Sequence, residues 1–119
     1  MKIAELVPDI ELCKLIPWGE FRDSIFVHNI DDIGTYILWT REDRILSEGW
    51  HIYPAPTLQE TMEKLPSCVC YRMNEEWSVG LVNDSAENAI KDSSGATAAL
   101  KLWLKLKRID VQKTEKFEQ

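Results

Sequence analysis

The sequence predicts one α+β domain: a largely antiparallel sheet of four or five strands, covered on one face by three helices. The expected order is helix, three strands, helix, two strands, helix. Three observations support this class. The chain has 119 residues, 45% apolar and 29% charged, which suits one compact soluble domain. Its strand-like segments follow each other too closely for parallel crossovers. Its three short amphipathic segments cannot form a bundle core alone, so we expect them to cover a sheet.

The first two helices are expected at about residues 9–16 and 57–65. In the first, Asp9 follows a proline and can cap the helix, and Pro17 ends it. In the second, Thr57 and Glu60 have the spacing of a capping box. Pro66 disfavours helical angles at the residue before it, so the second helix ends there.

The strands are expected to form two hairpins and one short additional strand. Asp31 to Gly34 forms the first turn, and Asn74-Glu75 forms a tight second turn. The short strand should end at Tyr53, because Pro54 and Pro56 cannot donate to a ladder. The five predicted strands are 24–28, 35–40, 50–53, 68–73 and 76–82.

The last helix is expected at about residues 94–108, capped by Ser93 or Ser94. Apolar residues recur there with helical spacing and define one buried face. Residues 1–110 form the predicted domain, and residues 111–119 a polar, frayed tail. The predicted core consists of Leu12, Leu15, Phe26, Leu38, Leu58, Met62, Leu65, Val79, Leu81, Ala99, Leu102, Trp103 and Leu106.

The net charge of −6 is unevenly distributed: residues 1–95 carry −9 and residues 96–119 carry +3. An acidic body argues against duplex nucleic acid as the main partner, because phosphate contacts require clustered cations. The apolar runs are too short to span a membrane, and Glu5 and Pro8 interrupt the N-terminal segment, which is unlike a secretory signal. We therefore expect a cytoplasmic protein with neither nucleic-acid nor membrane partners.

The cysteines and histidines do not form a recognisable metal or catalytic motif. Cys68 and Cys70 would have Cα atoms roughly 6.5–7 Å apart on a strand, at the limit for a disulfide, so reduced thiols are expected for them and for Cys13. We predict no metal, no cofactor and no catalytic residue, and an enzymatic role is the less favoured hypothesis. The alternative is a small-ligand-binding or catalytic domain that uses His28 and His51, or Cys68 and Cys70.

The chain contains five tryptophans, an unusually high number for 119 residues. A small core can use such large side chains, and Trp103 lies at a helical core position. Trp18, between Pro17 and Gly19, and Trp50 are the best candidates for an exposed binding patch. A basic stripe on the last helix could face an acidic partner or the acidic body of a second copy. The predicted interaction surface is therefore Trp18, Trp50, Lys101, Lys105 and Arg108.

Several blocks of the chain form a recognisable pattern. The most distinctive block is Ala55-Pro56-Thr57-Leu58 with Glu60 and Leu65-Pro66. The pattern also includes Leu6-Val7-Pro8 with Glu11-Leu12-Cys13-Lys14 and Ile16, Ser24 with Phe26-Val27, Tyr53, Gln59, and Ala98-Ala99-Leu100 with Leu102-Trp103-Leu104. In these blocks, over about residues 6–104, the chain resembles a family of small phage, prophage and mobile-element proteins of gut-type bacteria. The resemblance implies an accessory role in a bacterial cytoplasm, with no established activity or catalytic residues to transfer. The resulting hypothesis is a non-enzymatic protein-interaction module.

Overall fold

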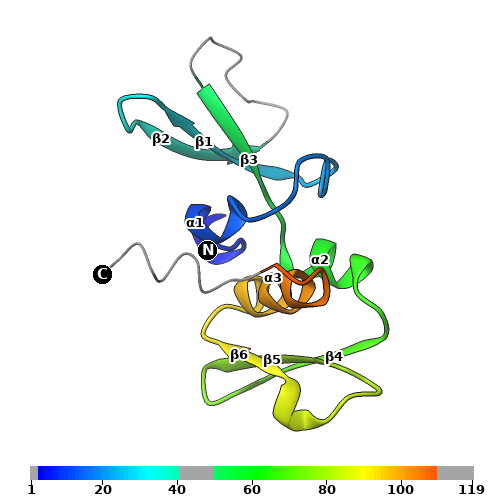
Figure 1. Ribbon diagram of the computed structural model, residues 1–119. Helices are drawn as coiled ribbons and strands as arrows, with labels where there is room; N and C mark the ends of the chain where they lie inside the picture. Colours follow the sequence, from blue (N-terminus) through cyan, green and yellow to red (C-terminus); the bar gives the residue numbers. More distant parts are fainter. Residues whose placement is uncertain (1–2, 41–49, 110–119) are drawn as a thin grey trace, which may run out of the picture.

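The computed structural model describes residues 3–40 and 50–109, arranged as two antiparallel sheets with helices between them (Figure 1). The chain is therefore α+β, but it does not form the single sheet of four or five strands that the sequence predicted. The elements are η1 (Ile3–Glu5), α1 (Ile10–Cys13), β1 (Phe26–Asp31), β2 (Tyr36–Thr40), β3 (Trp50–Ala55), α2 (Leu58–Lys64), β4 (Cys68–Met73), β5 (Glu76–Leu81), η3 (Ala86–Asn88), β6 (Ile90–Asp92) and α3 (Gly95–Leu106).

Sheet A has the strand order β2-β1-β3. Its central strand pairs on both sides, so that Val27 lies opposite Trp39 on β2 and opposite Pro54 on β3. The predicted end of β3 at Tyr53 is wrong, because the strand continues to Ala55. Proline is tolerated there since β3 is an edge strand and Pro54 lacks only a hydrogen-bond donor.

Sheet B has the strand order β4-β5-β6. Asn74 and Glu75 both have positive φ angles, 53° and 65°, as a two-residue hairpin turn between twisted strands requires. Strand β6 was not predicted, because three residues, Ile90 to Asp92, are too few to show an alternating pattern. This strand completes the second sheet and changes the predicted order of elements.

Helix α3 is the central element of the fold and lies between the two sheets (Figure 1). One side of α3 packs on β5 and β6, where Ala98, Ala99 and Leu102 meet Val79. The other side packs on α1 and on the segment that follows α1, through the buried Leu100, Trp103 and Leu104 together with Leu12, Cys13, Ile16 and Phe21. The wide apolar surface of α3 is thus buried against two clusters, while Lys101 and Lys105 lie on its remaining, more exposed side.

The predicted helix termini need two corrections. Helix α1 ends at Cys13 rather than residue 16, because the hydrogen bonds tighten to i→i−3 spacing from Leu15 onward. Helix α3 ends at Leu106 rather than residue 108. All three predicted capping residues are confirmed: Asp9, Thr57 and Ser94 accept backbone N–H groups, and Thr57 and Glu60 form the full capping box.

The predicted core is confirmed for Leu12, Val79, Ala99, Leu102 and Trp103, the last of which is only 2% exposed. Leu106 was predicted in the core, but it is 41% exposed, because Trp103 and Leu104 of the same turn pack on the α1 side while Leu106 joins neither buried cluster and its neighbours Lys105 and Lys107 are exposed. The other predicted core residues are half-buried: Leu15, Phe26, Leu38, Leu58, Met62, Leu65 and Leu81. The predicted polar loop 41–49 and the predicted tail lie outside the described residues.

Candidate functional site

The loop between α1 and β1, residues 17–24, holds Trp18 away from the body of the protein. We call this segment the display loop. The Trp18 side chain is 95% exposed, although tryptophan is among the most apolar side chains by area. The guanidinium carbon of Arg22, in the same loop, lies 5.9 Å from the centre of the indole ring. The loop therefore presents a large aromatic surface with a cation beside it.

Buried side chains hold the display loop in place. Phe21 is fully buried, and its ring meets that of Trp103 on α3 at 4.9 Å between centroids. Ser24 is buried as well, and the amide of Ile25, just after the loop, donates to Glu60 Oε2 at 2.9 Å. Backbone hydrogen bonds from Glu20 to Pro17 and from Ser24 to Phe21 close two turns within the loop. Trp18 is thus displayed on a fixed scaffold.

The five residues of the predicted interaction surface lie in the display loop, on β3, on α3 and, for Arg108, just after the end of α3. Trp18 is in the display loop, and Trp50 is half-buried at the start of β3, opposite Asp31. Lys101 does not extend freely from α3, because its Nζ donates to Asp92 Oδ2 at 3.1 Å. Lys105 and Arg108 are exposed. The basic stripe is therefore shorter than predicted, and of the two candidate tryptophans Trp18 is the exposed one.

His28 lies in the middle of β1, at the edge of an open cleft of about 600 Å³ between sheet A and the start of α3. Its Nε2 donates to the carbonyl of Pro8 at 2.9 Å, so its Nδ1 accepts from the Tyr36 hydroxyl at 2.6 Å. Burial lowers the pKa of His28, an effect only partly offset by the Pro8 carbonyl and Asp9. A neutral imidazole with both nitrogens engaged connects β1 to Tyr36 on β2 and to the Pro8 carbonyl before α1.

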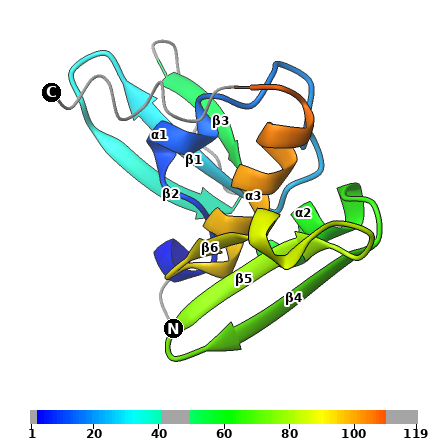
Figure 2. The same cartoon turned by 60° about the horizontal axis from the view of Figure 1, so that its bottom comes forward.

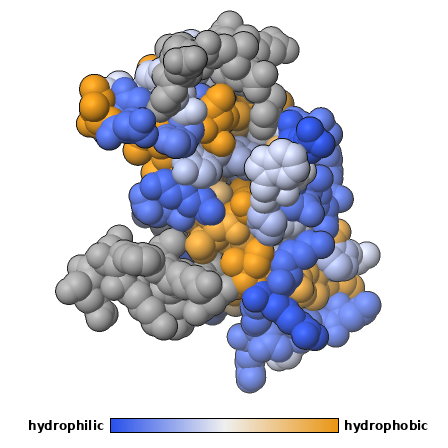
Figure 3. Space-filling view, turned by 45° about the horizontal axis from the view of Figure 1, so that its top comes forward, coloured by the Kyte–Doolittle hydropathy of each residue, from blue (hydrophilic) through white to orange (hydrophobic). Residues whose placement is uncertain are grey.

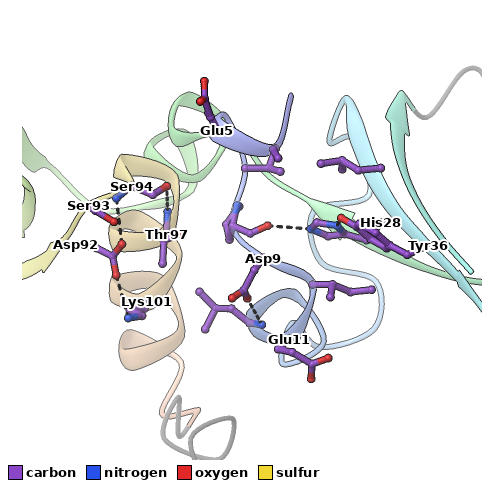
Figure 4. A pocket seen from close by; sticks show the side chains of 16 residues that line it. Glu5, Asp9, Glu11, His28, Tyr36, Asp92, Ser93, Ser94, Thr97 and Lys101 are labelled. Atoms are coloured by element: carbon purple, nitrogen blue, oxygen red, sulfur yellow. Dashed lines mark hydrogen bonds and ion pairs between the residues drawn. The ribbon is translucent and has the colours of Figure 1, made fainter. Parts of the chain in front are cut away.

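The polar groups on the opposite side of this cleft are engaged with each other as well. Figure 4 shows His28 and Tyr36 on one side and the start of α3, with Asp92 and Lys101, on the other. Asp92 also accepts the Ser94 amide at 3.0 Å, and Asp9 accepts the Leu12 amide at 2.9 Å. Asp9 thus caps α1, and Asp92 is engaged by the Ser94 amide and by Lys101.

His51 and the cysteines do not form a second chemical site. His51 is on β3, with Nε2 2.9 Å from the Asp32 carboxylate at the surface. Cys13 is fully buried, its thiol facing the Pro8 carbonyl, and burial raises its pKa strongly. Burial, with a smaller effect of neighbouring Cys68, also raises the pKa of the Cys70 thiol. Within residues 3–40 and 50–109, no three His, Cys, Asp or Glu side chains are grouped to hold a metal.

A larger groove of about 1230 Å³ runs along α2 and past the start of α3. Sequence reasoning did not identify it, because its walls come from six separate segments and only the folded chain brings them together. Arg72 is at its rim, with its guanidinium carbon 6.0 Å from the centre of the Trp77 ring. Its apolar lining consists of Leu6, Ile25, Leu58, Met62, Trp77 and Ala96.

Figure 3 shows one face of the molecule, with hydrophobic side chains gathered across its middle between hydrophilic residues.

Among the described helices, none has the length and apolar character needed to span a bilayer. The chain was compared with family models, curated proteins and solved structures, and none of them matched.

Proposed function

We propose that the protein is a non-enzymatic protein-interaction module, and that Trp18 on the display loop is the anchor that enters a pocket on its partner. The observation that carries this proposal is the 95% exposure of Trp18 on a loop whose other apolar residue, Phe21, is fully buried. Tryptophan is enriched among the few residues that dominate binding energy at interfaces. A loop already fixed in the free protein loses little conformational entropy on binding.

The chemistry of the remaining candidates supports a binding role over a catalytic one. Both ring nitrogens of His28 are hydrogen-bonded, and the thiol of Cys13 is buried in the core. The resemblance to phage and mobile-element proteins supports an accessory role in a bacterial cytoplasm, with a host or phage protein as partner. The pairing of Lys101 with Asp92 reduces the free cationic surface of α3, which supports our expectation that nucleic acid is not the partner.

The test is affinity capture from a bacterial lysate, before and after phage induction, with the full chain as bait. Wild type, Trp18→Ala and Ile33→Ala are compared. Ile33 is the matched control, because it is another large apolar residue, 89% exposed, in the turn between β1 and β2. We expect a protein captured by wild type and by Ile33→Ala but lost with Trp18→Ala. Equal capture by all three baits would contradict the role of Trp18.

A second candidate function is the binding of a small amphipathic ligand in the groove of about 1230 Å³, whose lining combines apolar side chains with Arg72. The fluorescent anion 8-anilinonaphthalene-1-sulfonate is a direct probe of such a site. If the groove takes small ligands, Ile25→Asp abolishes the fluorescence gain and Ile33→Asp leaves it unchanged. The absence of any gain with wild type would exclude this second function.

A further inference from the structure

Strand β4 is the edge of sheet B, and in Figure 2 no other described element lies beyond it. Each of its six residues is paired with β5, from Cys68 opposite Leu81 to Met73 opposite Glu76. In an antiparallel ladder, every second residue directs its N–H and C=O away from its partner strand. The free side of β4 therefore presents a regular row of backbone donors and acceptors over its whole length.

The other sheet edges carry features that discourage pairing, and β4 does not. Strand β3 contains Pro54, β6 has only three residues, and η1 contacts β2. Strand β4 has neither proline nor lysine. Its one charged residue, Arg72, has its guanidinium near the Trp77 ring of β5, on the side away from the free edge.

The outer face of β4 is apolar and exposed. Val69, Tyr71 and Met73 alternate along the strand and point away from α3, with exposed fractions of 49%, 47% and 62%. Cys70, between them, faces the core that α3 makes with sheet B. An apolar stripe beside an unpaired ladder is a combination that native proteins normally avoid leaving open.

We propose that β4 pairs antiparallel with β4 of a second copy of this chain, about a two-fold axis that passes beside Tyr71. The axis is perpendicular to the sheet, so outward-facing residues of one copy meet outward-facing residues of the other. Tyr71 then lies opposite the partner's Tyr71, and Val69 lies opposite the partner's Met73. The two sheets B join into one continuous sheet of six strands.

A second copy of this chain is the proposed partner of β4, because the apolar stripe of Val69, Tyr71 and Met73 is self-complementary in this register. All three apolar residues find apolar partners, and such cross-strand pairs stabilise a sheet. Arg72, the one charged residue of β4, comes to lie opposite the partner's Cys70, so charged side chains do not face each other between the two edge strands. A register centred on Cys70 would instead place Met73 opposite the partner's Ser67 and leave it without an apolar partner.

Sedimentation velocity over a concentration series tests whether the dimer forms. We expect wild type to dimerise and Tyr71→Lys to weaken the association by about tenfold or more, because two lysines would face each other across the axis. The matched control is Ile33→Lys, which exchanges an exposed apolar residue for the same charge in the turn between β1 and β2. A wild type that stays monomeric at every concentration overturns the proposal, and so does a dimer that Tyr71→Lys leaves intact.

Disulfide trapping tests the register and uses a Cys68→Ala, Cys70→Ala background. Tyr71→Cys places two thiols directly opposite, with Cα atoms about 4.5–5.5 Å apart, within the range for a disulfide. In the Val69→Cys variant, the Cα atoms of the two introduced cysteines would lie roughly 13 Å apart along the strands. Mild oxidation should cross-link the Tyr71→Cys dimer rapidly and leave Val69→Cys uncross-linked. The reverse pattern would contradict the register. Neither experiment depends on Trp18, so their failure would leave the proposed function standing.

Discussion

The ring of Phe21 meets the ring of Trp103 edge-on, with 4.9 Å between centroids and 64° between planes. This contact joins the display loop to α3, the helix that lies between the two sheets. Phe21 adopts a left-handed backbone conformation, with φ of 57°, and only 2% of its side chain is exposed. The position of Trp18, three residues earlier, therefore depends on the packing of the central helix.

Replacing Phe21 with alanine should lower the free energy of unfolding by about 3–5 kcal/mol, because a buried aromatic ring is lost and a cavity remains. Phe21→Leu should cost less, since most of the volume is kept and mainly the aromatic pairing is lost. Urea denaturation followed by circular dichroism measures both. If Phe21→Ala unfolds at the wild-type urea concentration, the loop is not anchored through this ring.

The stability of the protein should fall as the pH is lowered from about 7.5 to about 5.5, and His28 should account for part of the loss. Burial holds the pKa of folded His28 below its ordinary value of 6.5. The unfolded chain therefore takes up this proton more readily, so protonation favours unfolding as the pH passes below the ordinary value. The loss levels off once folded His28 is itself protonated.

Urea midpoints across this pH range test the role of His28. His28→Gln should flatten the pH dependence, because it removes the buried imidazole whose pKa is lowered by folding. An unchanged pH dependence in His28→Gln would show that burial of this imidazole is not coupled to folding.

Glu60 should matter more for stability than Thr57, although both belong to the same capping box. Thr57→Ala removes one acceptor, for the Glu60 amide, and should cost about 0.5–2 kcal/mol. Glu60→Ala removes the acceptor for the Thr57 amide at 2.8 Å and the acceptor for Ile25 at 2.9 Å. Chemical denaturation measures the loss of unfolding free energy in each variant. A larger loss for Thr57→Ala than for Glu60→Ala would contradict the prediction.

Gly95→Ala should be destabilising by about 1–3 kcal/mol, although alanine is the better helix former by about 1 kcal/mol. A Cβ at this position would lie 2.9 Å from Cδ2 of Trp77 and 3.1 Å from Cδ2 of Leu58. A double-mutant cycle separates the two effects. In a Trp77→Leu background the cost of Gly95→Ala should shrink, and an unchanged cost would mean that the indole is not the obstacle.

Local sequence signals predicted the parts of this fold that depend on neighbouring residues. The caps at Asp9, Thr57 and Ser94 and the turn at Asn74-Glu75 follow from side chains within a few positions of each other. The separation into two sheets could not be predicted in that way. It depends on which strands pair across long distances in the sequence, and the third strand of sheet B, β6, is too short for a periodic signal. The apolar residues Leu100 and Leu104, which widen the predicted apolar face of α3, were the available signal that this helix packs on more than one side.

Part of the candidate site could likewise be predicted from local sequence signals, and part of it could not. The exposure of Trp18 was predicted from its place in a loop between Pro17 and Gly19, and the structure agrees. The anchoring of the display loop by Phe21 and Glu60 was not predictable, because their partners Trp103 and Ile25 are far away in the sequence. The engagement of His28 with Pro8 and Tyr36 is likewise a tertiary contact.

The most direct test of the central claim is a calorimetric titration of the captured partner with wild type, Trp18→Ala and Ile33→Ala, after circular dichroism has shown equal folding. We predict that Trp18→Ala weakens binding by about 2 kcal/mol or more, which is at least roughly thirtyfold in Kd, while Ile33→Ala changes it by less than about 0.5 kcal/mol. Equal affinities for Trp18→Ala and wild type would contradict the account.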